Sequence, residues 1–329
     1  MAQVEPFGAL PDGTPVERIR IAGGGLTAHV LTYGAVLQDL RLAGVDHPLV
    51  LGAEDLAAYL GPMTWFGAIV GRFANRIAGG RLTIDGRIHA LDRNEAGATC
   101  LHGGAEGAGR RVWRIEDLTG SRVVLGLTDP DGHMGFPGTV EIRTVIDLPG
   151  EGALSFDITA TTDAPTAVSL AHHGYFNLDD SSDILGHKLW IDAEHFTPVD
   201  RSLIPTGVSP VGGTPFDFRS ERPVAPGGFD HNFCLSDAAQ PLREVARLTG
   251  TTGVSMAIET TAPGLQVYDG GHISDLPGLG GRLHGPHAGI ALETQVWPDA
   301  PNQTGFPEWR LDPGETYRHQ VIYRFQRAR

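Results

Sequence analysis

Residues 140–160 read VEIRTVIDLPGEGALSFDITA, and this stretch decides the fold class. From Val140 to Leu148 every second residue is apolar or threonine, with charged residues at most positions between, and the alternation returns from Leu154 to Ala160. A period of two indicates strands with one buried face, and the Pro149-Gly150 step between them is typical of a turn. The stretch therefore predicts two neighbouring antiparallel strands.

The same alternation occurs elsewhere, for example from Tyr317 to Phe325. The 45 glycines and 23 prolines among 329 residues disfavour a helical bundle, which needs long runs of good helix formers. Helices are expected to be few and short. Glu54 to Leu60 could form two helical turns, whereas Pro241 to Leu248 fits a helix or a strand almost equally well. We predict an all-β fold, a large antiparallel β-sandwich.

One stretch, Pro205 to Gly228, is rich enough in Pro and Gly to mark a domain boundary. The strand patterns before and after it look alike, and the chain has no internal repeat or low-complexity linker. We therefore expect residues 1–329 to form a single domain.

A hairpin is expected around Asp85-Gly86. A two-residue loop would place Ile84 opposite the charged Arg87, whereas a three-residue loop places it opposite Ile88 and keeps one face apolar. The hydrophobic pattern favours the three-residue loop, although Asp-Gly is a strong signal for the shorter one.

Charge and cysteine content exclude several classes of function. Thirty-nine acidic against 25 basic residues give a net charge of -14, and the chain has no basic block, so we expect no nucleic-acid partner. No apolar run approaches the roughly 20 residues of a membrane span, and the first residues do not read as a signal peptide. Cys100 and Cys234 have neither disulfide nor zinc-site spacing. We expect a cytoplasmic protein without membrane association.

Common catalytic signatures are absent, including the P-loop and the nucleophile elbow. Polar clusters in Gly-rich or aromatic surroundings remain as candidates. Arg72 and Arg76 in Gly71–Ile77 would point the same way on a strand, and either could bind ligand hydroxyls or form a structural salt bridge. Glu293 lies in an otherwise apolar strand-like run, where a carboxylate is either paired structurally or kept for base catalysis with a raised pKa.

Histidines are the other candidates. His102 precedes two glycines, which allow close approach to a ligand or a tight turn. His172 and His173 are adjacent, so on a strand they face opposite sides and at most one joins a given site. Histidine suits proton donation near neutral pH. The spacing of His172-His173 and of His284 and His287 matches no known mononuclear metal site, so we expect no metal.

Five motifs in order resemble the aldose 1-epimerases, also called galactose mutarotases. The resemblance covers essentially the whole chain, and the motifs are GRFANRI (71–77), LHGG (101–104), HGYFNL (173–178), DHNF (230–233) and LETQ (292–295) followed by PDAPN (298–302).

This resemblance implies a large β-sandwich and interconversion of the α and β anomers of a free aldohexose such as galactose or glucose. It implies that Glu293 is the general base on the O1 hydroxyl and that His173 is the general acid that protonates ring oxygen O5. No cofactor is implied, and the protein is expected to be a monomer or homodimer. The resemblance also places six residues around the sugar, namely Asn75, Arg76, His102, Tyr175, Asp230 and Gln266.

Two positions depart from the family pattern, which usually reads Asn-His-Ser/Thr-Tyr-Phe-Asn-Leu around the proposed acid. This chain has His172 in place of the Asn and Gly174 in place of the Ser/Thr. Because both residues flank the proposed acid, the family pattern does not determine the hydroxyl contacts here, nor the preferred sugar. The alternatives are a non-catalytic sugar-binding or regulatory protein of this fold, and an epimerase for a different sugar or a sugar phosphate.

Overall fold

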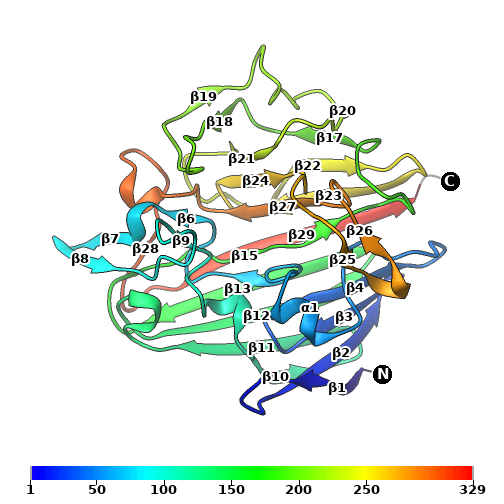
Figure 1. Cartoon of the computed structure of the whole chain (residues 1–329), viewed down its shortest axis with the longest axis horizontal. Coiled ribbons are helices and arrows are strands. Elements are labelled where there is room, and N and C mark those ends of the chain that lie inside the picture. Colours follow the sequence, from blue (N-terminus) through cyan, green and yellow to red (C-terminus); the bar gives the residue numbers. More distant parts are fainter. Residues whose placement is uncertain (1, 328–329) are drawn as a thin grey trace.

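The computed structural model describes residues 2–327, and their regular secondary structure consists mainly of antiparallel strands (Figure 1). The largest sheet has nine strands. In spatial order they are β10 (Arg114–Leu118), β11 (Arg122–Asp129), β12 (Val140–Gly150), β13 (Ala153–Thr162), β29 (Tyr317–Arg327), β23 (Val254–Thr260), β22 (Arg243–Thr249), β17 (Lys188–Ile191) and β20 (Arg222–Pro223).

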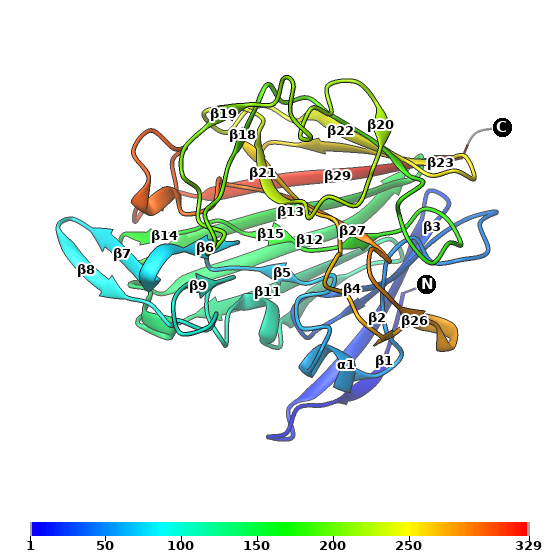
Figure 2. The ribbon, with the colours of Figure 1, turned by 45° about the horizontal axis from the view of Figure 1, so that its top comes forward.

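Two smaller sheets accompany it. The first has four strands, β1 (Gln3–Ala9), β2 (Pro15–Gly23), β3 (Leu26–Leu31) and β4 (Leu37–Leu42). The second has six strands in the order β16 (Tyr175–Phe176), β27 (Ile290–Gln295), β24 (Gly264–Tyr268), β21 (Asp230–Cys234), β18 (His195–Thr197) and β19 (Ser209–Pro210). In Figure 2 the four-stranded sheet lies at the lower right and β18, β19 and β21 lie at the top.

The remaining elements are short. Two-stranded ribbons pair β5 (Ile69–Val70) with β15 (Ala171–His172), β6 (Arg76–Ile77) with β9 (Cys100–Leu101), β7 (Arg81–Ile84) with β8 (Arg87–Ala90), β14 (Thr166–Ala167) with β28 (Arg310–Leu311), and β25 (Leu276–Pro277) with β26 (Leu283–His284). The helices are α1 (Leu56–Leu60) and the 3₁₀ turns η1 (Ala78–Gly80), η2 (Ala108–Arg110), η3 (His133–Gly135), η4 (Leu279–Gly281) and η5 (Ala300–Asn302). Within residues 2–327, none of these helices is long and apolar enough to cross a membrane.

The core lies between one face of the nine-stranded sheet and the two smaller sheets. Ile146 and Phe156 are opposite each other on β12 and β13, and they join one buried cluster with Ile21 of β2 and Leu292 of β27. The other face of the large sheet carries charged pairs such as Arg318 with Asp157. This arrangement confirms the predicted all-β sandwich with few short helices, including the two strands expected in residues 140–160.

Two local predictions have definite outcomes. The ambiguous segment around Pro241–Leu248 forms the strand β22. The Pro/Gly-rich stretch 205–228 contributes β19 to the six-stranded sheet and β20 to the nine-stranded sheet, so it lies within the fold.

The prediction of a three-residue loop at the Asp85-Gly86 hairpin is wrong. Ile84 pairs with Arg87, so the loop has two residues, and both have positive φ, 50° for Asp85 and 76° for Gly86. These angles are those of the type I′ turn that Asp-Gly favours. The β7–β8 ribbon leaves Ile88 54% exposed. Because nothing buries that side chain, the hydrophobic pattern does not determine the register here.

Candidate active site

The floor of the site is formed by three neighbouring strands of the six-stranded sheet. The register aligns Asn232 of β21 with Gln266 of β24, and Gln266 with Glu293 of β27. Residues opposite one another in an antiparallel sheet point to the same face. The alternate residues Leu265 and Leu292 enter the core. Glu293, which the sequence places in an apolar run, is therefore presented on the face of the sheet that points away from the core.

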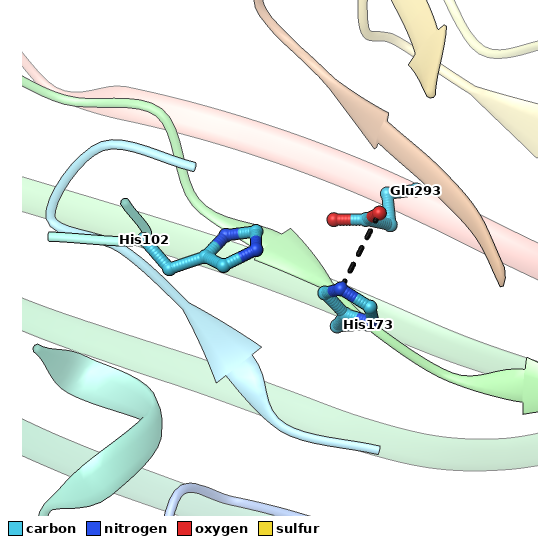
Figure 3. Close-up of side chains that lie close together, drawn as sticks. All are labelled: His102, His173 and Glu293. Atoms are coloured by element: carbon cyan, nitrogen blue, oxygen red, sulfur yellow. Dashed lines mark ion pairs between the residues drawn. The ribbon is translucent and has the colours of Figure 1, made fainter. Parts of the chain in front are cut away.

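His173 approaches Glu293 from the junction of β15 and β16. β15 pairs with β5, whereas β16 pairs with β27, the strand that carries Glu293. The Nε2 atom of His173 lies 3.5 Å from Oε1 of Glu293 (Figure 3). The other titratable atom of each side chain, Nδ1 of His173 and Oε2 of Glu293, is buried without a hydrogen-bond partner.

His102 faces the same space from the turn after β9 (Figure 3). The backbone N–H of Asn75 donates to Nδ1 of His102 at 3.1 Å, and the backbone N–H of His102 donates to the Asn75 carbonyl at 2.9 Å. Because Nδ1 accepts a hydrogen bond, its proton must lie on Nε2 in the neutral ring. His102 therefore offers an N–H donor to the site.

A charged cluster borders this group. Arg76 donates to both carboxylate oxygens of Glu95, from Nε at 2.9 Å and from Nη2 at 2.8 Å, and its Nη1 lies 3.6 Å from Oδ2 of Asp230. Gln266 donates from Nε2 to Oδ1 of Asp230 at 2.6 Å. Arg76 thus meets two carboxylates, while Gln266 supports one of them from the floor.

The cavity that these residues share has a volume of about 480 Å³. Seven of the eight site residues expected from the sequence line it, and Gln266, only 2% exposed, does not. The lining also includes residues that the sequence analysis did not single out, chiefly Trp65, Phe66, Glu95, Tyr268 and His272.

Aromatic rings form one wall of the cavity. Phe66 stacks on Tyr175 with ring centroids 4.0 Å apart, and Trp65 lies 5.0 Å from the His102 ring. Trp65-Phe66 follows the short α1 helix, and an aromatic pair beside a Gly-Pro step is the sequence signal that could have drawn attention to this wall. Aromatic faces are suited to contact the C–H faces of a ring-shaped ligand.

Burial shifts the pKa of both central groups toward their uncharged forms. Desolvation raises the pKa of Glu293 well above its ordinary value, and nearby Asp230 adds to the rise while Arg76 opposes it. Burial lowers the pKa of His173 to about 4. Because burial disfavours the charge on each group, it favours the state in which the carboxyl carries the single proton and the imidazole is neutral.

The group His102, His173 and Glu293 has donor atoms within 4.8 Å of one another and could hold a metal ion. It is the one such group among residues 2–327. The sequence-based search for metal ligands considered His172-His173, His284 and His287 and did not find this combination, because the three residues are far apart in the chain. Absence of a metal requirement stays a prediction.

Arg72 and Arg76 do not point the same way, because the strand β6 begins only at Arg76. The Arg72 side chain is fully buried and donates from Nε to Asp129 at 2.8 Å and from Nη1 to the Pro137 and Gly138 carbonyls. Of the two alternatives for these arginines, Arg72 forms the structural ion pair and Arg76 lies at the cavity.

The two departures next to His173 are linked to each other. His172 points into the core, where its ring stacks on Phe156 at 4.3 Å and its Nδ1 lies 3.1 Å from the Tyr323 hydroxyl. A Cβ on Gly174 would lie 2.5 Å from Cε1 of His172. Neither residue lines the cavity. Gly174 thus makes room for His172, and the changes at both positions concern packing beneath the site rather than the cavity lining.

Solved structures with this fold include an aldose epimerase homologue and a galactose 1-epimerase. A TM-score of 0.89 at 29% identity relates the chain to the crystal structure of an aldose epimerase homologue from C. elegans, covering 95% of this chain and 99% of that one. Galactose 1-epimerase from Lactobacillus acidophilus gives a TM-score of 0.87 at 27% identity, with 100% and 99% covered. The fold and the cavity thus define the class: a β-sandwich of the galactose mutarotase type.

Sequence comparisons narrow this class to a family. The family described as aldose 1-epimerase matches residues 17–324. The galactose mutarotase of Rattus norvegicus is 38% identical over 98% of both chains, and the aldose 1-epimerase of Escherichia coli is 34% identical over 96% of both. The chain belongs to the aldose 1-epimerase family, as its motifs predicted.

Proposed function

We propose that this protein is an aldose 1-epimerase, an isomerase that interconverts the α and β anomers of a free aldohexose such as galactose or glucose. The observation that carries the proposal is the Glu293–His173 pair, a carboxylate and an imidazole 3.5 Å apart at the cavity. Relatives named galactose mutarotase and aldose 1-epimerase support the same activity.

Ring opening of a cyclic hemiacetal needs one proton removed from O1 and another delivered to O5. Glu293 takes the O1 proton while protonated His173 gives its proton to O5, so the C1–O5 bond breaks and the open-chain aldehyde forms. After rotation about the C1–C2 bond, O5 attacks the opposite face of the aldehyde and both proton transfers run in reverse. The pair begins and ends each turnover with one proton.

Because the pair carries a single proton, burial affects which of the two side chains, His173 or Glu293, holds it. The state that opens the ring has the proton on His173 and a charged Glu293, an arrangement that burial disfavours for each group alone. A sugar whose O1 donates to Glu293 and whose O5 accepts from His173 stabilises both charged forms. Substrate binding therefore moves the proton to the position where it is used.

The other lining residues hold the sugar. Arg76 and His102 donate hydrogen bonds to hydroxyl groups, Asp230 accepts them, and Asn75 contributes its side-chain amide. Tyr175 belongs to the aromatic wall with Phe66. Gln266 acts from below by holding Asp230. Buried polar groups that pair with a hydroxyl penalise a sugar that lacks it.

An unphosphorylated sugar fits the charges of the cavity better than a sugar phosphate. Arg76 is the single Arg or Lys side chain among the described lining residues, and it already faces Glu95 and Asp230. A non-catalytic sugar-binding protein has no need for the Glu293–His173 pair.

We also propose a cytoplasmic location, which agrees with two free cysteines, and a monomer or homodimer that requires no other macromolecular partner.

Polarimetry on freshly dissolved α-anomers tests the proposal. We expect the protein to speed the approach to anomeric equilibrium of galactose or glucose, and to act far less on glucose 6-phosphate. Arabinose in the same panel measures how much the hydroxymethyl group contributes. A rate equal to that of buffer alone for every free sugar would contradict the function.

A further inference from the structure

Glu95 is a cavity residue that takes no part in the proton transfers described above. It follows the β7–β8 ribbon, and its carboxylate accepts three hydrogen bonds, two from Arg76 and one at 2.5 Å from the Thr99 hydroxyl. A fork of two parallel N–H bonds fixes the plane of a guanidinium group as well as its position.

The fork leaves one end of Arg76 free. Nε and Nη2 are bound to Glu95, so Nη1 is the end directed at Asp230, at a distance of 3.6 Å. That distance is too long for a direct hydrogen bond but short enough for a hydroxyl group to bind both side chains. Without Glu95, the buried Arg76 charge would be neutralised by Asp230 alone, and the two would close into a direct ion pair.

The segment that carries Glu95 is itself anchored to the site. The Asn94 side chain accepts from the Leu101 backbone N–H at 2.8 Å and donates to the Leu101 carbonyl at 3.0 Å. Leu101 precedes His102 and pairs with Arg76 across the β6–β9 ribbon. Asn94 and Glu95 therefore tie the positions of Arg76 and His102 to each other.

We propose that Glu95 is a positioning residue for substrate recognition: it holds the Arg76 guanidinium apart from Asp230 so that both can bind the same sugar hydroxyl. The proposal rests on the proposed epimerase function. Because Glu95 acts on binding rather than on proton transfer, its loss should affect KM much more than kcat.

Steady-state polarimetry on Glu95→Ala and Glu95→Gln tests this role. We expect Glu95→Ala to raise KM for the preferred sugar about tenfold, with kcat within about threefold of wild type, since charge-assisted hydrogen bonds hold Arg76. Glu95→Gln keeps one acceptor and the shape of the side chain, so its KM should rise less. Glu106→Gln is the matched control, because Glu106 is 72% exposed and is absent from the cavity lining.

The outcomes separate the two proposals. An active wild-type protein whose Glu95 variants keep the wild-type KM would overturn the positioning role and leave the epimerase function standing. An equal loss of kcat in both Glu95 variants would also overturn it, since it would indicate a role in proton transfer. If Glu95→Ala fails to fold, Glu95→Gln alone decides. A wild-type protein without mutarotase activity overturns both proposals.

Discussion

Two arginines four residues apart, Arg72 and Arg76, lie in different surroundings in this fold. Arg72 is fully buried, and its N–H groups are taken up by Asp129 and backbone carbonyls. Arg76 has one edge bound to Glu95 and the other facing the cavity. A structural arginine has its donors used within the protein, whereas an arginine that serves a ligand keeps donors free.

The neighbouring histidines repeat this contrast. His172 is stacked and bonded in the core beneath the site, whereas His173 faces Glu293 with one ring nitrogen unpartnered. Changes on the core side should therefore affect stability, and changes on the cavity side should affect activity. Four predictions test this division.

The largest effect is expected at Glu293. Glu293→Gln should lower kcat/KM by about 10²–10⁴-fold in polarimetry, because it removes the base that we propose for the O1 proton. Thermal unfolding should show no loss of stability, since a neutral amide replaces a carboxylate that burial already disfavours. A variant with activity within a factor of two of wild type would contradict the assignment of the base.

Arg72→Met should behave in the opposite way. It leaves Asp129 paired with Arg111 but removes the donor to the Pro137 and Gly138 carbonyls. We therefore expect the free energy of unfolding, measured by urea titration, to fall by about 1–3 kcal/mol. The protein that remains folded should keep its kcat. Arg122→Met is the control, because the Arg122 and Asp117 side chains are 42% and 49% exposed and such surface pairs contribute about 0–1 kcal/mol. Equal losses in the two variants would contradict the structural role.

Gly174→Ser tests the packing beneath the site. The new Cβ would meet the His172 ring at 2.5 Å, so we expect a loss of about 1–3 kcal/mol. The double variant His172→Asn/Gly174→Ser should recover at least about 1 kcal/mol of that loss, because it removes the ring that is in the way. Additive effects in the double-mutant cycle would show that the two positions are independent.

The smallest of the four expected effects is the change of activity with pH. With one proton required on the pair, acid inactivates when His173 and Glu293 both become protonated, and the pKa of about 4 for His173 sets that limb. Alkali removes the last proton only above the raised pKa of Glu293. We therefore expect kcat/KM to fall as the pH drops through about 4, and to stay level above that up to the raised pKa of Glu293. A fall centred at the ordinary histidine value of about 6.5 would contradict this proton inventory.

The sequence predicts the fold class well because the alternation of apolar and polar residues indicates which face of each strand is buried. It also predicts which side chains gather at the cavity, through family motifs. Gln266 shows the limit of that approach: it donates a hydrogen bond to Asp230 but does not line the cavity. A family motif predicts that a residue lies near the site. Whether its side chain reaches the cavity surface depends on the side chains that pack over it.

Other features could not be predicted because their partners are distant in the chain. Arg72 and Asp129 are separated by 57 residues, so nothing local distinguishes Arg72 from Arg76. Trp65 contributes to the wall only because the β9 turn brings His102 beside it. The hairpin error has a different cause: turn chemistry determined the register at Asp85-Gly86, where the ribbon is too exposed for burial to do so.

The position of β29 has a consequence for how the protein is made. This strand comes after all the others in the described chain, yet it lies in the middle of the nine-stranded sheet between β13 and β23. Its Tyr323 contacts His172, and its His319 contacts Thr294 beside Glu293. During synthesis, β13 and β23 cannot be joined into one sheet, and the Glu293–His173 pair lacks this support, until β29 is available. Folding of the site therefore waits for β29, and a chain that stops before β29 should be inactive and prone to aggregation through the unpaired edges of β13 and β23.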